Sequence, residues 1–94
     1  MDQWPSQELL ESIHAFPCCY TFKVIGTPDD HFIGRVVSAV RMYLPPDAEP
    51  AFSSRSTASG RHVCVTIEPH MESAAVVIEV YQQLHALEGV VMLL

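Results

Sequence analysis

The chain has 94 residues, which suffice for one small domain and not for two separate cores. Hydrophobic residues make up 49% of it and charged residues 17%, so the chain is too apolar to be disordered and has apolar surface available for self-association. The formal net charge is −6 and the five basic residues are scattered, so no nucleic-acid partner is expected.

Residues 1–16 are expected to form a helical leader, followed by a domain over residues 17–94. Ser6 is a candidate N-cap, and Pro17 ends the helix. Apolar residues fall at helical spacing between them, namely Leu9, Leu10, Ile13 and Phe16. The leader is therefore expected to pack on the domain through this face.

The first strand is predicted over residues 18–25, which are rich in β-branched and aromatic types, and Gly26 closes it. Alternation assigns one set of side chains to the core: Tyr20, Phe22 and Val24. The other set faces away from the core and consists of Cys19, Thr21, Lys23 and Ile25.

The first helix of the domain is predicted from Thr27 to about Leu44. Thr27 can cap it, Pro28 suits its first turn, and Asp29 and Asp30 complement the positive end of the helix dipole. One apolar stripe is expected to face the sheet: Phe32, Ile33, Val36, Val37, Val40 and Leu44. Pro45 and Pro46 stop the helix.

Two further strands and a flexible hairpin loop are predicted next. Residues 49–56 form a weak strand that Pro50 places at an edge of the sheet, and the hairpin loop spans residues 53–60. Residues 62–68 form a clear strand with Val63, Val65 and Ile67 on one face and His62, Cys64 and Thr66 on the other.

A second helix and a final strand complete the chain. The helix is predicted over residues 69–87, with Gly89 just past its end. Its buried face is expected to contain Ala74, Val77, Ile78, Tyr81 and Leu84. Residues 90–94 lack polar alternation, which predicts a strand covered on both faces.

This β-α-β-β-α-β order predicts an α+β fold, the ferredoxin-like sandwich. A four-stranded antiparallel sheet then carries both helices on one face. Its opposite face is expected to be open to a ligand or a partner.

Cysteine usage indicates a reducing, cytoplasmic setting. Three cysteines, Cys18, Cys19 and Cys64, cannot all pair within one chain. The first residues lack the basic and apolar regions of a secretion signal, and the longest apolar runs are too short to span a bilayer. We therefore expect a cytoplasmic protein without membrane contact.

Several segments resemble one known family. These are Phe16-Pro17, the run from Tyr20 to Gly26, residues 60–67, and Tyr81. They are similar to the YbeD-like bacterial family of unknown function, and the likeness extends over about residues 9–94. The resemblance implies an ACT-like ferredoxin fold in a bacterial cytosolic protein. Ser59 and His62 stand where that family usually has a lysine and an aromatic residue.

ACT-like regulatory domains often bind a small effector near the turn between the first strand and the first helix. The resemblance therefore makes candidate ligand-binding residues of Lys23, Gly26, Thr27, Asp29 and Asp30. A helix N-terminus offers free N–H groups, and glycine lets a ligand approach the backbone. Ordinary helix capping explains the same residues, and Lys23 could instead pair with Glu68 across the strands.

The sequence offers no recognisable catalytic apparatus and no cofactor or metal site. Its histidines lie on different elements without helical i, i+4 spacing, and adjacent cysteines do not have the Cys-x-x-Cys spacing of redox or metal-transfer chemistry. The first loop has no arginine to hold a phosphate, as an acylphosphatase would need. The third strand offers only His62 for stacking RNA bases.

We therefore expect a non-catalytic, ACT-like regulatory or small-molecule-binding module that works as a homodimer. The candidate interface is the open face, at Thr21, Ile25, His62, Cys64 and Thr66. One alternative is an adaptor that docks on a metabolic enzyme or a regulator without a small ligand. Another is a small enzyme whose site lies at an interface with a second chain.

Overall fold

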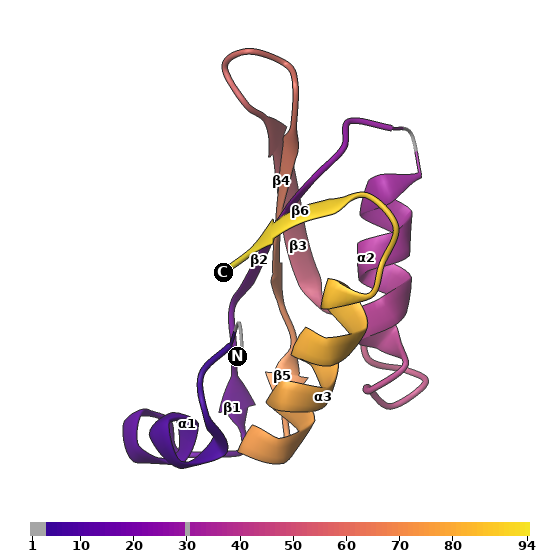
Figure 1. Cartoon of the computed structure of the whole chain (residues 1–94). Coiled ribbons are helices and arrows are strands. Elements are labelled where there is room, and N and C mark those ends of the chain that lie inside the picture. The colour runs from indigo at the N-terminus through magenta and orange to yellow at the C-terminus, as the bar shows by residue number, and fades with distance from the viewer. Residues whose placement is uncertain (1–3, 30) are drawn as a thin grey trace.

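In the computed structural model, which describes residues 4–29 and 31–94, four antiparallel strands form the main sheet (Figure 1). Their spatial order is β3-β4-β2-β6, where the bounds are β2 (Phe22–Gly26), β3 (Ala51–Ser56), β4 (Val63–Glu68) and β6 (Val90–Leu93). Helices α2 (Phe32–Arg41) and α3 (Ala74–His85) connect them and lie on the same side of the sheet. This is the ferredoxin-like sandwich that the sequence predicts.

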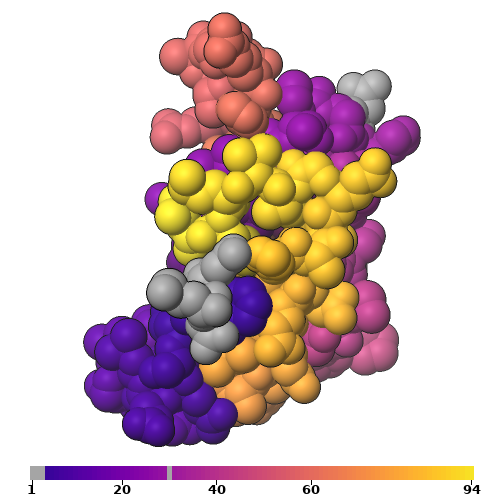
Figure 2. Space-filling view, viewed as in Figure 1, coloured from indigo at the N-terminus to yellow at the C-terminus, as the bar shows by residue number. Residues whose placement is uncertain are grey.

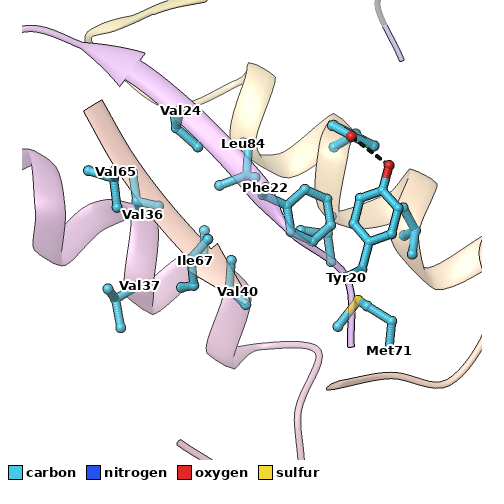
Figure 3. Close-up of a cluster of buried hydrophobic side chains, with 14 of the residues drawn as sticks. Tyr20, Phe22, Val24, Val36, Val37, Val40, Val65, Ile67, Met71 and Leu84 are labelled. Atoms are coloured by element: carbon cyan, nitrogen blue, oxygen red, sulfur yellow. Dashed lines mark hydrogen bonds between the residues drawn. The ribbon is translucent and has the colours of Figure 1, made fainter. Parts of the chain in front are cut away.

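Between the sheet and the two helices lies one hydrophobic core. Phe22 and Val24 of β2 pair in register with Ile67 and Val65 of β4, and all four side chains are fully buried. Figure 3 shows them facing side chains of α2 and α3, Leu84 among them. The predicted alternation of both strands is therefore confirmed, and each such side chain contributes roughly 1.5–3 kcal/mol by its burial.

The helix faces differ from the predicted stripes at a few positions. On α3, Val80 is fully buried beside the predicted Val77 and Leu84, whereas Ile78 is only half-buried. On α2, which ends at Arg41, Ala39 joins the core and Ile33 packs at its margin, as does Leu44 beyond the end of the helix. A predicted stripe identifies only the side of the helix that faces the sheet. The angle at which the helix crosses its neighbours then decides which flanking residue is buried.

The predicted single strand over residues 18–25 is wrong in one respect, because the chain changes partners at Tyr20. Strand β1 (Cys18–Cys19) pairs with β5 (His70–Met71) in a small separate sheet. The amide of Tyr20 then donates to the carbonyl of Pro69 at 3.0 Å, and β2 begins at Phe22 beside β4.

The predicted start of the first domain helix is also wrong. Helix α2 begins at Phe32 with His31 as its N-cap, four residues after Pro28. The carboxylate of Asp29 accepts the amide of His31 at 2.9 Å and holds residues 27–29 in a turn. Thr27 donates its hydroxyl to this carboxylate and does not cap the helix.

At the C-terminal half, two predictions need correction. Helix α3 begins at Ala74, not at residue 69, because residues 70–71 pair with β1 and the Ser73 hydroxyl accepts the amide of Val76 at 3.2 Å. Strand β6 is not covered on both faces, since it forms an edge of the sheet and exposes Val91 and Met92 by 56% and 51%.

The leader packs against α3, as expected. Its helix α1 (Gln7–Ile13) is capped by Ser6, whose hydroxyl accepts the amide of Leu9 at 3.2 Å. Of the predicted apolar face, only Leu10 is fully buried, whereas Leu9 and Ile13 are at least half exposed. Trp4 precedes the helix and stacks on Tyr81 with ring centroids 6.2 Å apart.

A buried pair of tyrosine hydroxyls lies beneath the leader. The hydroxyls of Tyr20 and Tyr81 are 2.9 Å apart and hydrogen-bond to each other, as the dashed line in Figure 3 marks. Burial is the main cause that raises the pKa of Tyr81, and the hydrogen bond to Tyr20 adds to it. Tyr81 therefore keeps its hydroxyl proton at neutral pH.

Candidate functional site

The sheet face turned away from α2 and α3 carries exposed polar side chains. We call it the open face and define it by residues that share register: Lys23, Ile25, Ser53, Arg55, Cys64, Thr66 and Met92. Lys23, Ser53, Arg55 and Met92 are exposed, and the other three are half-buried. Helices therefore leave this face uncovered.

Two hollows lie over the open face. The smaller has a volume of about 320 Å³ and includes Ser53 and Thr66 in its lining. The larger has a volume of about 630 Å³ and extends toward the β3–β4 hairpin. Both are lined by Lys23, Arg55 and Cys64, so two cationic side chains and a free thiol lie at their common border.

The open face carries two cations, Lys23 and Arg55, and one acid of β4, Glu68, which shares the alternation of Cys64 and Thr66. Arg35 and Arg41 form ion pairs with Asp29 and Glu49. Among residues 4–29 and 31–94, no ion pair includes Lys23 or Arg55. The pairing of Lys23 with Glu68 that the sequence left open is not formed there, because Lys23 lies opposite Thr66 in register. An acidic protein thus carries a local cationic patch on its open face.

The turn between β2 and α2 has the opposite character. The Asp29 carboxylate accepts two hydrogen bonds from the Arg35 guanidinium, at 2.9 and 3.2 Å, beside those from Thr27 and His31. These bonds, with the one from Arg35 as the largest cause, hold the pKa of Asp29 well below its usual range, and Asp29 in turn raises the pKa of Arg35. Arg35 also donates to the Glu88 carbonyl at 3.1 Å and so ties this turn to the loop before β6.

Packing alone accounts for the glycine at the end of β2. A Cβ atom at Gly26 would collide with the Phe32 ring and lie 2.7 Å from the carbonyl oxygen of Gly89. Gly89 itself has a φ of 92°, which few residues other than glycine adopt, and its carbonyl accepts the amide of Thr27 at 3.0 Å. The backbone at Gly26 is therefore approached by the protein's own side chain.

The predicted ligand-binding residues are thus divided between two places. Lys23 lies on the open face, whereas Gly26 is the last residue of β2 and Thr27 and Asp29 belong to the turn that follows it. Asp30 lies outside the described residues. Ligand binding by this set remains a prediction, and the hydrogen bonds of Asp29 leave its carboxylate engaged within the turn.

The predicted interface residues lie largely together on the open face. Ile25, Cys64 and Thr66 are half-buried neighbours there. Thr21 precedes β2 and is exposed, and His62 lies at the base of the hairpin, where its amide donates to the Thr57 hydroxyl at 3.3 Å. Their role as an interface remains a prediction.

Sequence reasoning did not single out Arg55, the second cation of the open face. Its signal was the weak strand predicted over residues 49–56. Phe52 pairs with Ile67 on the core side, so alternation places Ser53 and Arg55 on the other face. Because this strand was predicted only weakly, its alternation was not used to place Arg55 on the open face.

Other reactive residues do not gather into a second site in the described part of the chain. Cys18 is half-buried and Cys19 exposed on β1, far in sequence from Cys64, and all three thiols are free. Across residues 4–29 and 31–94, no group of three or more histidine, cysteine or acidic side chains could hold a metal ion. The helices described there are also too short or too polar to cross a membrane.

Residues 11–94 match a family described as Protein of unknown function (DUF493). Among curated relatives, the UPF0250 protein of Shewanella sediminis is 34% identical over 88% of this chain and 88% of its own length. Those of Shewanella woodyi and Shewanella piezotolerans are 35% and 36% identical, with the same coverage. These names state a family and no activity.

Solved structures agree with the fold. Two solution structures of protein HP0495 from H. pylori have TM-scores of 0.69 and 0.57 to this chain. They cover 86% and 84% of it, and 85% and 87% of their own chains, at 17% and 19% identity. At this identity the likeness concerns the fold alone.

Proposed function

We propose that this chain, which belongs to the family described as Protein of unknown function (DUF493), is a non-catalytic binding module whose working surface is the open face. The membership confirms the family resemblance inferred from the run Tyr20 to Gly26 and the other quoted segments. Because the family has no assigned activity, the proposal is supported by the geometry of this chain. A regulatory role, in which a small molecule occupies the open face, is the form that we favour.

One observation carries the proposal, namely the two unbalanced cations at the border of the hollows on an otherwise uncovered sheet face. A volume of about 630 Å³ suits a small ligand, since such sites usually have roughly 300–1,000 Å³. Side chains that only stabilise the fold usually have their partners within it, as Asp29 and Arg35 do. Lys23 and Arg55 contribute no described ion pair and are available to a ligand.

We also propose that the protein forms a homodimer, through the sheet edges in preference to the open face. A two-fold axis that stacked two open faces would bring Lys23 and Arg55 of both copies together, and like charges repel. Both edge strands expose large apolar side chains, Phe52 on β3 and Val91 with Met92 on β6. The free thiols fit a reducing cytosolic setting for either assembly.

A ligand screen followed by mapping on the protein tests the proposed function. Thermal unfolding of the full chain is measured with a panel of amino acids, carboxylates, phosphates, amines and neutral metabolites. A ligand at one hundred times its Kd adds about 2.7 kcal/mol of stability, which raises the Tm of a chain this size by roughly 10 °C or more. Amide chemical shifts in an NMR titration then locate the compound.

Matched variants decide whether the open face is the site. Thr66→Trp places a bulky ring on the open face and is expected to abolish the shift. Gln82→Trp, on the exposed side of α3, is expected to leave it unchanged. A ligand whose amide shifts map elsewhere would refute the proposal, and a panel without any hit alongside one purified protein partner would favour the adaptor function.

A further inference from the structure

We infer that the open face recognises a low-molecular-weight dianion, carrying carboxylate or phosphate groups, held between Lys23 and Arg55. This inference rests on the proposed function, because it names the chemistry that the same surface would bind. Lys23 and Arg55 would bind the negative charges of the ligand, and hydroxyl groups beside them would donate hydrogen bonds to it.

The register of the sheet places the two cations around a common centre. Arg55 on β3 lies opposite Cys64 on β4, and Lys23 on β2 lies opposite Thr66, two residues further along β4. With strands about 4.8 Å apart and a rise of about 3.4 Å per residue, the two Cα atoms are about 12 Å apart. Both side chains are long enough to reach a ligand above β4 from opposite sides.

Neutral hydrogen-bond donors lie between the cations. Ser53 and Thr66 are opposite each other in register, so their hydroxyls share the open face, and both line the smaller hollow. A hydroxyl donates to a carboxylate or phosphate oxygen as readily as to water. A dianion above β4 would therefore meet a cation at each end and hydroxyl donors beneath it.

The distribution of basic residues favours an anion over other ligands. Of the five basic residues, Arg35 and Arg41 are engaged by carboxylates, and the two on the open face are Lys23 and Arg55. Glu68, the acid of β4, lies on the same face two residues beyond Thr66, opposite Ala51, and forms no ion pair with Lys23 or Arg55 among the described residues. The chain has a net charge of −6, yet Lys23 and Arg55 share one face without an ion-pair partner among the described residues. A bound dianion would neutralise these two cations.

Concavity favours a small molecule over an acidic protein segment. The two hollows share Lys23, Arg55 and Cys64, so the cations lie at the border of two partly open hollows of about 630 and 320 Å³. A protein partner more often needs a broad surface of roughly 800 Å² per partner. The proposal therefore commits to a small dianion.

The test is an NMR titration of the full chain with succinate, inorganic phosphate and neutral succinamide. We expect succinate or phosphate to shift the amides around Lys23, Arg55 and Thr66, and succinamide to leave them in place. Lys23→Gln or Arg55→Gln should weaken the binding about tenfold, as the loss of one charge-assisted hydrogen bond does. Arg61→Gln, which removes an exposed arginine outside the sheet, is the matched control and should change nothing.

Different outcomes separate this inference from the proposed function. Three results would overturn the inference of a small dianion but leave the open face as a binding surface. They are equal binding of succinamide, equal weakening by Arg61→Gln, and tighter binding of a hexaglutamate peptide than of succinate. If no compound of any charge in the wider panel perturbs the open face, both proposals fail. Lys23→Arg, which keeps the charge, should restore most of the affinity that Lys23→Gln loses.

Discussion

The turn between β2 and α2 and the open face both carry charged side chains, but the fold uses them differently. In the turn, Asp29 and Arg35 are joined by two hydrogen bonds, and Arg35 also binds the Glu88 carbonyl. On the open face, Lys23 and Arg55 take part in no ion pair among the described residues. The first pair therefore stabilises the fold, whereas the second is available to something outside it.

This comparison shows why residue types alone are poor evidence for a site. The resemblance to ACT-like domains made the turn between the first strand and the first helix a candidate effector site, and the same residues are explained by a structural turn. In this chain the Phe32 ring lies where a Gly26 side chain would be, and Asp29 accepts hydrogen bonds from the protein itself. Only the partners of each group distinguish the two interpretations.

The largest expected effect comes from adding a side chain at Gly26. Gly26→Val would force the Phe32 ring and the Gly89 loop apart, so we expect a loss of about 3 kcal/mol of unfolding free energy, the upper range for overpacking. Urea unfolding measures it. Gly34→Ala is the matched control, because its Cβ meets nothing within 4 Å on α2, and it should gain about 0.5–1 kcal/mol. Equal stability of Gly26→Val and wild type would mean that the turn has room for a ligand.

A smaller effect is expected at the tyrosine pair, the other polar contact that the fold satisfies internally. Tyr81→Phe leaves the buried Tyr20 hydroxyl without its partner and should cost about 1–2 kcal/mol. The double variant with Tyr20→Phe should cost less than the sum of the two single variants, because no unpaired hydroxyl remains. Additive costs in urea unfolding would show that the two hydroxyls act independently.

The same pair predicts a pH dependence at high pH. The pKa of Tyr81 is raised by burial and by its bond to Tyr20, whereas an unfolded tyrosine ionises near pH 10. A folded-state pKa above the unfolded value means that the stabilisation is complete below about pH 10 and decreases as the pH rises beyond it. Wild type should therefore lose stability above pH 10 more steeply than Tyr81→Phe, and parallel curves would contradict this.

Asp29 predicts the opposite pH dependence, at low pH. Its pKa is lowered mainly by the hydrogen bond from Arg35, so its contribution is present above the unfolded value of about 3.9 and decreases as the pH falls below it. Asp29→Asn should thus be less stable than wild type at pH 7, and the difference should shrink between pH 4 and pH 2. A difference that does not change with pH would show that the carboxylate charge contributes nothing.

How much the sequence predicts depends on whether a signal is repeated along the chain. Alternation predicted the buried faces of β2 and β4, and with them the sandwich and its open face. Strands β1 and β5 have two residues each and carry no periodic signal, so they were missed. The start of α2 was misplaced because a side chain, Asp29, takes the amide of His31 in place of a helical bond.

The site was less predictable than the fold for a related reason. Lys23 was recognised because it lies in a strongly patterned strand. Arg55 was not, because β3 has every residue exposed and its own alternation is weak. The contact of Arg35 with Glu88 joins residues 53 positions apart, and no local pattern encodes it.

The smallest expected effect is the one that sharpens the comparison most. The double variant Lys23→Gln and Arg55→Gln should unfold within about 0.5 kcal/mol of wild type, as is usual for exposed positions that make no contacts. Removing two cations from an acidic chain adds some repulsion among its carboxylates, so any change should be a slight loss that salt reduces. Urea unfolding at low and high NaCl measures the change in unfolding free energy and its dependence on salt. If the double variant lost as much as Gly26→Val, Lys23 and Arg55 would be structural residues with partners inside the fold. The open face would then be no more available to a ligand than the turn is.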